Sequence, residues 1–281
     1  MVKRLLADLP LSEQLMHCTV RIESEDAAGN ISEGTGFFYQ MLQEDESLQY
    51  IVMVTNKHVI EGSEVGRFVL NLADENGNHI LGSQEVITLT EFEQRWIKHP
   101  EDVDLCMMPL APIIREGETK GKYYSILTLT RDDIPSDEQI CQLNAIEDII
   151  MIGYPNGIWD RFNNFPVMRR GITATHPKYD YNGKQEFLID AACFPGSSGS
   201  PVFIFNEESF IDKEQGLIFR TKIYLMGVLY AGHRYTTTGE VKIEEVPTGL
   251  QSISSIFINL GIIIKASNLL VFERILRERN S

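Results

Sequence analysis

The chain has 281 residues, which is enough to bury a substantial core and to form two units that share one site. Its hydrophobic fraction of 43% and charged fraction of 23% are typical of globular proteins. The net charge is −15 and no basic run with interleaved aromatic residues occurs, so we expect neither nucleic acid nor an anionic membrane as a partner.

The N-terminal segment begins with basic residues but has no apolar stretch, because Asp8 and Glu13 interrupt it. We therefore expect no signal peptide and a cytoplasmic location. The longest apolar stretch, residues 256–264, contains Asn259 and is too short to span a membrane.

Short apolar runs bounded by Gly, Asn and Pro predict strands rather than helices along most of the chain. These runs lie at residues 18–22, 36–39, 50–55, 67–72, 86–89, 105–110, 149–152, 187–191, 202–205, 223–229 and 256–264. Turn sequences at 74–78 and 181–184 predict hairpins. Many strands without long intervening helices favour antiparallel barrels. The last segment, 267–277, has apolar residues at helical spacing and predicts a helix with Ser267 as its N-cap.

The four cysteines, at positions 18, 106, 141 and 193, are scattered along the chain. Without a secretory signal, they predict free buried thiols in a reducing compartment. The sequence contains neither C-x-x-C nor H-E-x-x-H, so we expect no zinc or other metal, and no cofactor is indicated.

A Gly-Ser-Ser-Gly-Ser-Pro segment at 196–201 places Ser198 on a tight turn with a glycine on either side. Gly196 allows backbone N–H groups to turn toward a developing oxyanion, and the second glycine leaves the approach to the hydroxyl open. This setting suits a nucleophile. Ser197 and Ser200 compete for the role, and the flanking Gly and Pro favour Ser198.

A Thr-Asn-Lys-His-Val-Ile segment at 55–60 holds His58 directly after an apolar run. A lone histidine is more often a hydrogen-bonded core residue, but this local sequence, combined with the serine turn, favours a catalytic role. The remaining histidines lack such a context and are expected to be surface or structural residues: His17, His79, His99, His176 and His233.

An Asp-Leu-Cys-Met-Met-Pro-Leu segment at 104–110 supplies a carboxylate between the histidine and the serine. Asp102 and Asp104 would share a face of one strand. If Asp102 oriented His58, Asp104 would be buried without a partner, which costs free energy. We therefore choose Asp104, and Asp102 is the alternative.

Histidine, aspartate and serine in this chain order resemble the chymotrypsin-like serine peptidases. The local sequences are similar to the HtrA-type bacterial branch and to trypsin-like peptidase domains more widely. Gly-Thr-Gly-Phe-Phe at 34–38, Ile-Gly-Tyr-Pro-Asn-Gly at 152–157 and the stretch 261–269 resemble further segments of that family.

The resemblance implies an all-β, chymotrypsin-like fold with two antiparallel six-stranded barrels and a C-terminal α-helix. We expect residues 14–140 to form the first barrel and the crossover, and residues 141–281 to form the second barrel and the helix. No PDZ-sized segment follows, which differs from the HtrA-type pattern.

The resemblance also implies a serine endopeptidase that cleaves protein or peptide substrates through an acyl-enzyme. His58 would take the Ser198 proton, Asp104 would fix the imidazole tautomer, and the N–H groups of Gly196 and Ser198 would stabilise the oxyanion. Secreted trypsin-like enzymes place an aspartate just before the nucleophile, where it pairs with a newly cut N-terminus. Ser197 stands at that position, so we expect an enzyme that needs no zymogen cut.

In this family the position six before the nucleophile lies at the base of the primary pocket, and here it is Ala192. The pocket wall resembles Leu229, Tyr230 and Ala231. These residues predict a small or medium apolar side chain before the scissile bond, unless Asp190 turns into the pocket.

Two other activities stay open: a catalytically latent domain that binds peptides or assembles, and ester hydrolysis by the same chemistry. Polar segments at 206–220 and 232–249 predict solvated hairpin loops, and residues 159–165 have enough aromatic surface to dock substrate or the site itself. The sequence gives no oligomeric state.

Overall fold

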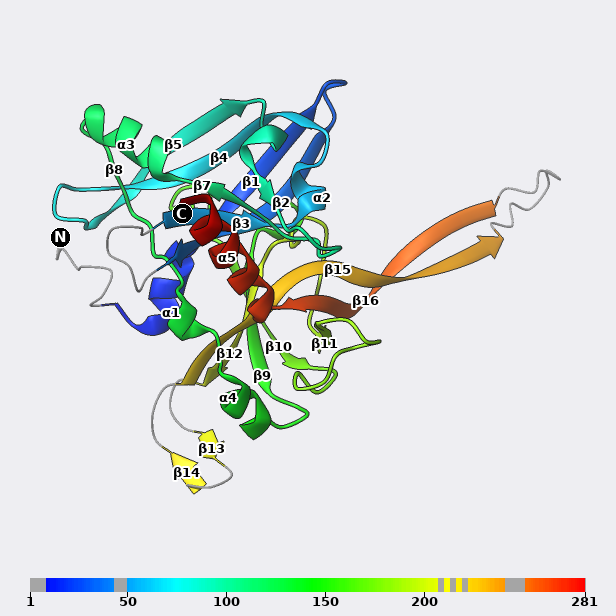
Figure 1. The fold of residues 1–281 in the computed structure, drawn as a ribbon. Coiled ribbons are helices and arrows are strands. Elements are labelled where there is room, and N and C mark those ends of the chain that lie inside the picture. The colour runs from blue at the N-terminus through cyan, green and yellow to red at the C-terminus, as the bar shows by residue number, and fades with distance from the viewer. Residues whose placement is uncertain are drawn as a thin grey trace.

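The structure of the protein is a computed structural model that describes residues 9–42, 50–206, 210–212, 216–218, 222–240 and 251–280. It consists mostly of antiparallel strands in two large sheets, with a C-terminal helix, α5 (Leu269–Asn280), lying between them (Figure 1). The division of the chain into residues 14–140 and 141–281 stays a prediction.

The first sheet has eight strands in the order β5-β4-β1-β2-β3-β7-β6, with β8 paired to β4. Their bounds are β1 Thr19–Asp26, β2 Ile31–Met41, β3 Tyr50–Thr55, β4 Ser63–Ala73, β5 His79–Thr90, β6 Ile97–Lys98, β7 Cys106–Pro109 and β8 Tyr123–Tyr124. The turn predicted at 74–78 joins β4 to β5.

The prediction of a closed six-stranded barrel in this half is wrong, because no described pairing joins β5 to β6. The connection between these two end strands passes through a short 3-10 turn, η3 (Glu93–Arg95). The turn places Phe92 and Trp96 in the core, where their rings meet edge-on at 5.6 Å. Between β5 and β6, the described structure therefore has packed side chains where a closed barrel would have backbone hydrogen bonds.

The second half is the closed antiparallel barrel that we expected, in the order β10-β11-β16-β15-β12-β9. Its strands are β9 Asp148–Gly153, β10 Val167–Thr173, β11 Glu186–Asp190, β12 Pro201–Asn206, β15 Lys222–Glu240 and β16 Gln251–Lys265. Strand β10 was not predicted, because Arg169, Arg170 and Gly171 interrupt its apolar pattern.

Strands β15 and β16 run beyond the barrel as a two-stranded ribbon that projects from the body of the molecule (Figure 1). Backbone pairing continues from Arg234 opposite Phe257 to Glu240 opposite Gln251. The segment 232–249 is thus paired strand up to Glu240, and its remainder lies outside the described residues. In the other polar segment, β13 (Phe210–Asp212) pairs with β14 (Gly216–Ile218).

The remaining helical elements are short. They are α1 Leu11–Gln14, η2 Leu15–His17, α2 Lys57–Ile60, α3 Ala111–Thr119, η4 Arg131–Asp133, α4 Asp137–Gln142, η5 Pro155–Gly157 and η6 Ala266–Asn268. Three of them, α3, η4 and α4, lie in the crossover between the sheets.

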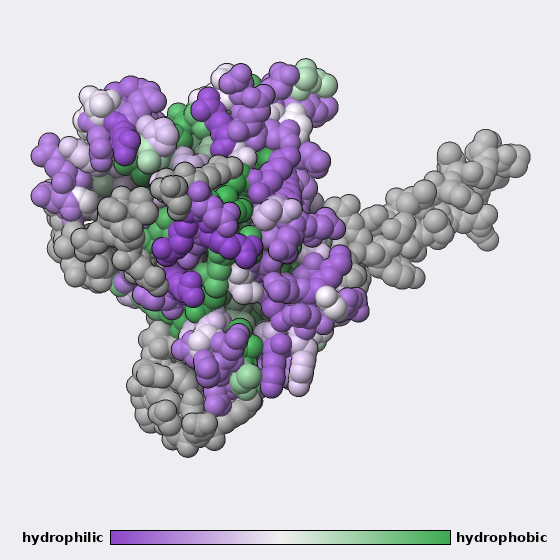
Figure 2. All heavy atoms as spheres, in the orientation of Figure 1, coloured by the Kyte–Doolittle hydropathy of each residue, from purple (hydrophilic) through white to green (hydrophobic). Residues whose placement is uncertain are grey.

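Helix α5 packs into the largest core cluster, which also contains buried residues of both sheets. Leu269, Phe272 and Leu276 are its buried apolar residues in that cluster. Ser267 does not cap this helix as predicted, because it lies inside the 3-10 turn η6 that precedes it. On the face shown in Figure 2, hydrophilic residues cover the outer parts and hydrophobic residues show mainly in the middle.

Candidate active site

His58 and Asp104 meet at the edge of the first sheet. Strand β3 ends at Thr55, and the single turn α2 then carries His58 outward, where its Nδ1 lies 2.5 Å from Oδ2 of Asp104. The backbone N–H of His58 donates to the other oxygen, Oδ1, at 3.1 Å. The Asn56 side chain donates to the Asp104 carbonyl at 2.7 Å. Three hydrogen bonds therefore fix the carboxylate relative to the imidazole.

This geometry bears on the tautomer of His58. An ionised carboxylate can only accept hydrogen bonds, so the imidazole nitrogen that faces it carries the proton. The other nitrogen, Nε2, is then left as an acceptor. Asp102, the alternative partner, is exposed and lines a different hollow with Lys184 and Glu186.

The turn before Ser198 is one that only glycine can complete. Gly196 has φ +85°, and a Cβ there would lie 2.5 Å from the Tyr154 carbonyl oxygen. Gly199 has φ +88°, and its Cβ would lie 1.9 Å from the Thr35 carbonyl oxygen. Both positions combine left-handed backbone with close approach of another strand, so any side chain would displace the turn.

The four residues from Phe194 to Ser197 form a turn closed by a hydrogen bond from the Ser197 N–H to the Phe194 carbonyl at 3.0 Å. Proline followed by a glycine of positive φ is typical of a type II turn. The Pro195 carbonyl accepts the Asn156 N–H at 2.6 Å. Because a trans peptide holds its C=O and N–H in opposite directions, the Gly196 N–H points away from Asn156.

A cavity of about 250 Å³ brings His58 and Ser198 together. Three of the four predicted substrate-binding residues, Leu229, Tyr230 and Ala231, also line it, while Ala192 does not. No hydrogen bond joins His58 to Ser198 in the described part of the chain. Catalytic hydrogen bonds are often long before substrate binds.

Four lining residues were missed by the sequence: Cys193, Phe194, Pro195 and Gly232. Three of them directly precede Gly196 in the sequence, and this position next to the serine motif was the signal that could have found them. Burial raises the pKa of the Cys193 thiol to about 11, so this sulfur stays protonated near neutral pH. Asp190 is exposed and is not among the lining residues.

The Tyr230 hydroxyl donates to a Glu186 carboxylate oxygen at 3.0 Å, which directs it toward strand β11. Burial, together with this carboxylate, raises the pKa of Tyr230. Apart from His58, the residues around the cavity carry no charge.

These positions can be compared with known proteins. The family described as trypsin-like peptidase domain matches residues 34–210, which is more than half of the chain. The chain belongs to the trypsin-like peptidase domain family. The match covers the segments that hold His58, Asp104 and Ser198. No curated protein matched the sequence.

Several solved structures are similar to this trypsin-like domain at low identity. The Rv3671c protease of M. tuberculosis in its active form is 14% identical, with 93% of this chain and 81% of that chain covered and a TM-score of 0.45. The serine endoprotease of Yersinia pestis is 16% identical, with 94% of this chain and 64% of that chain covered and a TM-score of 0.46. The HtrA-type protease AlgW with a decapeptide is 11% identical, with 94% of this chain and 65% of that chain covered and a TM-score of 0.47. This chain spans less than two thirds of the latter two.

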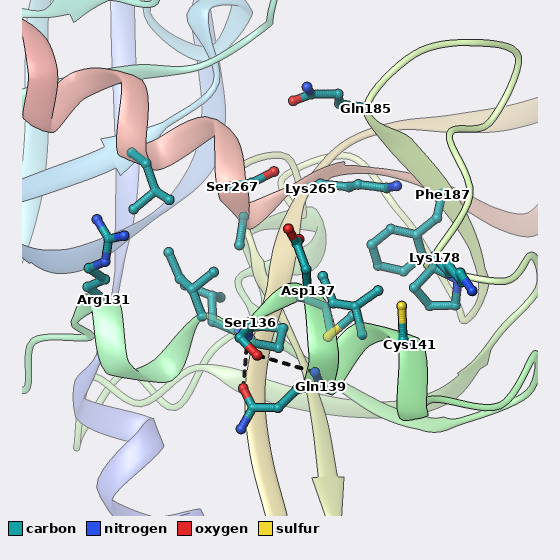
Figure 3. A pocket seen from close by; sticks show the side chains of 18 of the residues that line it. Arg131, Ser136, Asp137, Gln139, Cys141, Lys178, Gln185, Phe187, Lys265 and Ser267 are labelled. Carbon is teal, nitrogen blue, oxygen red and sulfur yellow. Dashed lines mark hydrogen bonds between the residues drawn. The ribbon is translucent and has the colours of Figure 1, made fainter.

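A larger cavity of about 770 Å³ lies elsewhere, between the crossover, the segment before β11 and the start of α5 (Figure 3). Lys265 there pairs with Asp180 at 2.6 Å, and Ser136 caps α4 in a reciprocal bond with Gln139. Its described lining includes Cys141 but no histidine. The exposed Cys141 corrects the prediction that all four thiols are buried.

Among the described residues, no group of three or more His, Cys, Asp or Glu side chains could hold a metal ion. None of the described helices combines the length and apolar character that crossing a membrane requires.

Proposed function

We propose that this trypsin-like domain is a serine endopeptidase with His58, Asp104 and Ser198 as its catalytic residues. The observation that carries the proposal is the contact between His58 and Asp104 at the rim of a cavity that Ser198 also lines. A nucleophile, a base and a group that orients the base are the three parts that acyl transfer requires.

In the proposed reaction, His58 Nε2 takes the proton of the Ser198 hydroxyl as Oγ attacks the scissile carbonyl. The imidazolium that forms keeps its Nδ1–H on the Asp104 carboxylate and later gives the Nε2 proton to the leaving amine. Water then hydrolyses the acyl-enzyme by the same proton transfers.

The oxyanion would be stabilised by the N–H groups of Gly196 and Ser198. Neither N–H donates a hydrogen bond to another described residue, and the Pro195 peptide holds the Gly196 N–H away from Asn156. Losing one such donor from an enzyme costs about 100- to 1,000-fold in kcat.

The cavity supports a small or medium apolar side chain before the scissile bond. Leu229, Ala231 and Cys193 are uncharged, and Asp190 is exposed and does not line the cavity. A peptide library that gave strong preference for Arg or Lys at this position would contradict the assignment. On the scattered thiols and acidic composition, a cytoplasmic location is part of the proposal.

The test is hydrolysis of an unfolded protein substrate by wild type, Ser198→Ala and His58→Ala. By the subtilisin precedent, loss of either residue lowers kcat by about a million-fold. A matched Ser125→Ala variant removes a buried serine that contacts His17 at 3.4 Å, outside the candidate site, and should keep wild-type turnover. Ser198→Ala cleaving at the wild-type rate would refute the assignment.

A second candidate is a latent domain that binds peptides through the same cavity, whose lining includes Phe194, Leu229 and Ala231. Wild type that binds an apolar peptide with micromolar affinity but never cleaves it would select this candidate.

A further inference from the structure

The turn that holds Ser198 lacks the charged anchor that secreted trypsin-like enzymes place just before the nucleophile. Ser197 occupies the position just before the nucleophile and is 1% exposed. Its hydroxyl has no hydrogen-bond partner among the described residues. The group that holds the turn must therefore come from elsewhere in the chain.

Thr35, on β2 of the first sheet, makes the contacts that Ser197 does not. Its side chain is completely buried, and its Oγ1 donates to the Gly196 carbonyl at 2.9 Å. The same oxygen accepts the Tyr154 N–H at 3.1 Å. The Thr35 backbone N–H donates to the Ser198 carbonyl at 2.8 Å. One residue thus bonds to both sides of the nucleophile turn and to the segment beside it.

The segment beside it completes the support. Tyr154 immediately precedes η5, where the Asn156 N–H holds the Pro195 carbonyl. The Thr35 hydroxyl therefore acts on the turn directly, through Gly196, and indirectly, through the position of Tyr154. Both actions favour the orientation in which the Gly196 N–H faces away from Asn156.

Thr35 is also connected to the histidine. Its carbonyl accepts the Thr55 hydroxyl at 2.7 Å, and Thr55 ends the strand that leads into α2. The next residue, Asn56, holds the Asp104 carbonyl. Hydrogen bonds thus link the pair formed by His58 and Asp104 to the Ser198 turn through Thr35.

We propose that the Thr35 hydroxyl is the positioning group that aligns the oxyanion turn with His58 and Asp104. The proposal rests on the proposed serine peptidase function. Thr35 touches neither substrate nor reacting atoms in this account. In place of a charged anchor, the Thr35 hydroxyl donates to the Gly196 carbonyl in the turn and accepts the Tyr154 N–H from the segment beside the turn.

The decisive variants are Thr35→Val, which keeps the shape and removes the hydroxyl, and Thr35→Ser, which keeps the hydroxyl. Displacement of a catalytic group by about 1 Å can cost about 100-fold in rate. We expect Thr35→Val to lower kcat by about 10- to 100-fold with KM within about threefold, and Thr35→Ser to keep kcat within about threefold.

The matched control is Thr173→Val in the second barrel. Thr173 is 1% exposed, and its hydroxyl donates to the Ala145 carbonyl at 2.8 Å and accepts the Glu147 N–H at 2.9 Å. Thr173→Val therefore removes one donated and one accepted hydrogen bond, as Thr35→Val does, but at a position outside the candidate site. We expect a comparable loss of stability and unchanged kcat.

Hydrogen exchange gives a readout that does not require activity. Thr35→Val should speed backbone exchange in residues 152–157 and 194–200, and Thr173→Val should not. If wild type hydrolyses nothing, the proposed function fails while exchange still tests Thr35. Wild-type exchange in Thr35→Val would then overturn the positioning role.

In an active enzyme, unchanged kcat in Thr35→Val would overturn the proposal, as would an equal loss in Thr35→Ser or in Thr173→Val. If Thr35→Val cannot fold, Thr35→Cys keeps the volume and weakens both bonds. A reduced kcat with unchanged KM in that variant would support the proposal, and wild-type kcat would overturn it.

Discussion

Two segments beside the candidate site differ in how they are held. Residues 158–165, between η5 and β10, lie against the first sheet, whereas the ribbon of β15 and β16 projects away from both sheets (Figure 1). Asn164 is 5% exposed and donates to the Val69 carbonyl and to Asn71 Oδ1 at 3.1 and 3.0 Å. In the ribbon, backbone pairing joins β15 to β16.

The docked segment has further contacts with the first sheet. The guanidinium of Arg21 lies 4.5 Å from the centre of the Trp159 ring, and Phe165 meets the rings of His17 and His79 at 5.2 and 5.6 Å. The sequence predicted that this aromatic segment docks substrate or the site itself. It docks on the first sheet instead. The comparison teaches that the segment adjoining the oxyanion turn is fixed by tertiary contacts, while backbone pairing holds the two strands of the ribbon to each other.

Among substitutions that test this comparison, Asn164→Ala is expected to have the largest effect on the free energy of unfolding. The substitution leaves the Val69 carbonyl and Asn71 Oδ1 without their donor, and each unpaired buried group costs about 1–3 kcal/mol. We expect the free energy of unfolding, measured in urea, to fall by about 3 kcal/mol. Asn163→Ala, which loses only a local bond to Asp160, should change it by less than about 1 kcal/mol. An equal loss of unfolding free energy in both variants would contradict the claim that Asn164 fixes this segment to the first sheet.

The docked segment should also weaken in acid, through His17. Burial, and then the neighbouring His79, lowers the pKa of His17 to about 4. The unfolded chain binds this proton from about pH 6.5 downward and the folded chain only near pH 4, so stability is complete above 6.5 and declines below it.

Between pH 7.5 and 5 the His17 contribution should fall by about 2 kcal/mol. His17→Phe should be less sensitive to pH over the same interval in chemical denaturation. An identical pH dependence in wild type and His17→Phe would contradict this account.

A smaller effect is expected from Trp159→Ala. It removes the ring beneath Arg21, and a cation–π contact at a partly exposed site contributes about 1 kcal/mol. Phe162→Ala is the control on the same segment, because Phe162 is 73% exposed. We expect a melting temperature lowered by about 2–4 °C for Trp159→Ala and unchanged for Phe162→Ala. The reverse order would show that the segment docks by its other face.

The smallest effect should follow removal of the ribbon. Replacing residues 236–255 by Asn-Gly leaves Tyr235 and Ile256, which are paired in the structure, on either side of a two-residue turn. An isolated two-stranded ribbon is marginally stable at best, so we expect the free energy of unfolding to change by less than about 1 kcal/mol. A loss above about 2 kcal/mol would mean that the ribbon supports the barrel.

The sequence predicted the strands well where apolar runs lie between turn residues, and it selected the closed second barrel. It failed where the pattern is interrupted, as in β10 with Arg169 and Arg170, and where side chains replace pairing, as at Phe92 and Trp96. Local sequence carries the alternation of a strand but not the identity of its neighbour.

For the candidate site, the sequence named residues that the structure brings to one cavity, and it chose the aspartate that contacts His58. It placed Ala192 in the cavity and missed Phe194 and Pro195. It also gave no sign of the role of Thr35, since that role depends on strands far apart in the chain meeting at one hydroxyl.

The central claim is that Ser198 is a serine activated by His58, and mapping of a fluorophosphonate adduct by peptide mass spectrometry tests it most directly. The account expects one adduct, on Ser198, in wild type and none above background in His58→Ala. An adduct on Ser197 or Ser200, or equal labelling of Ser198 in His58→Ala, would contradict it.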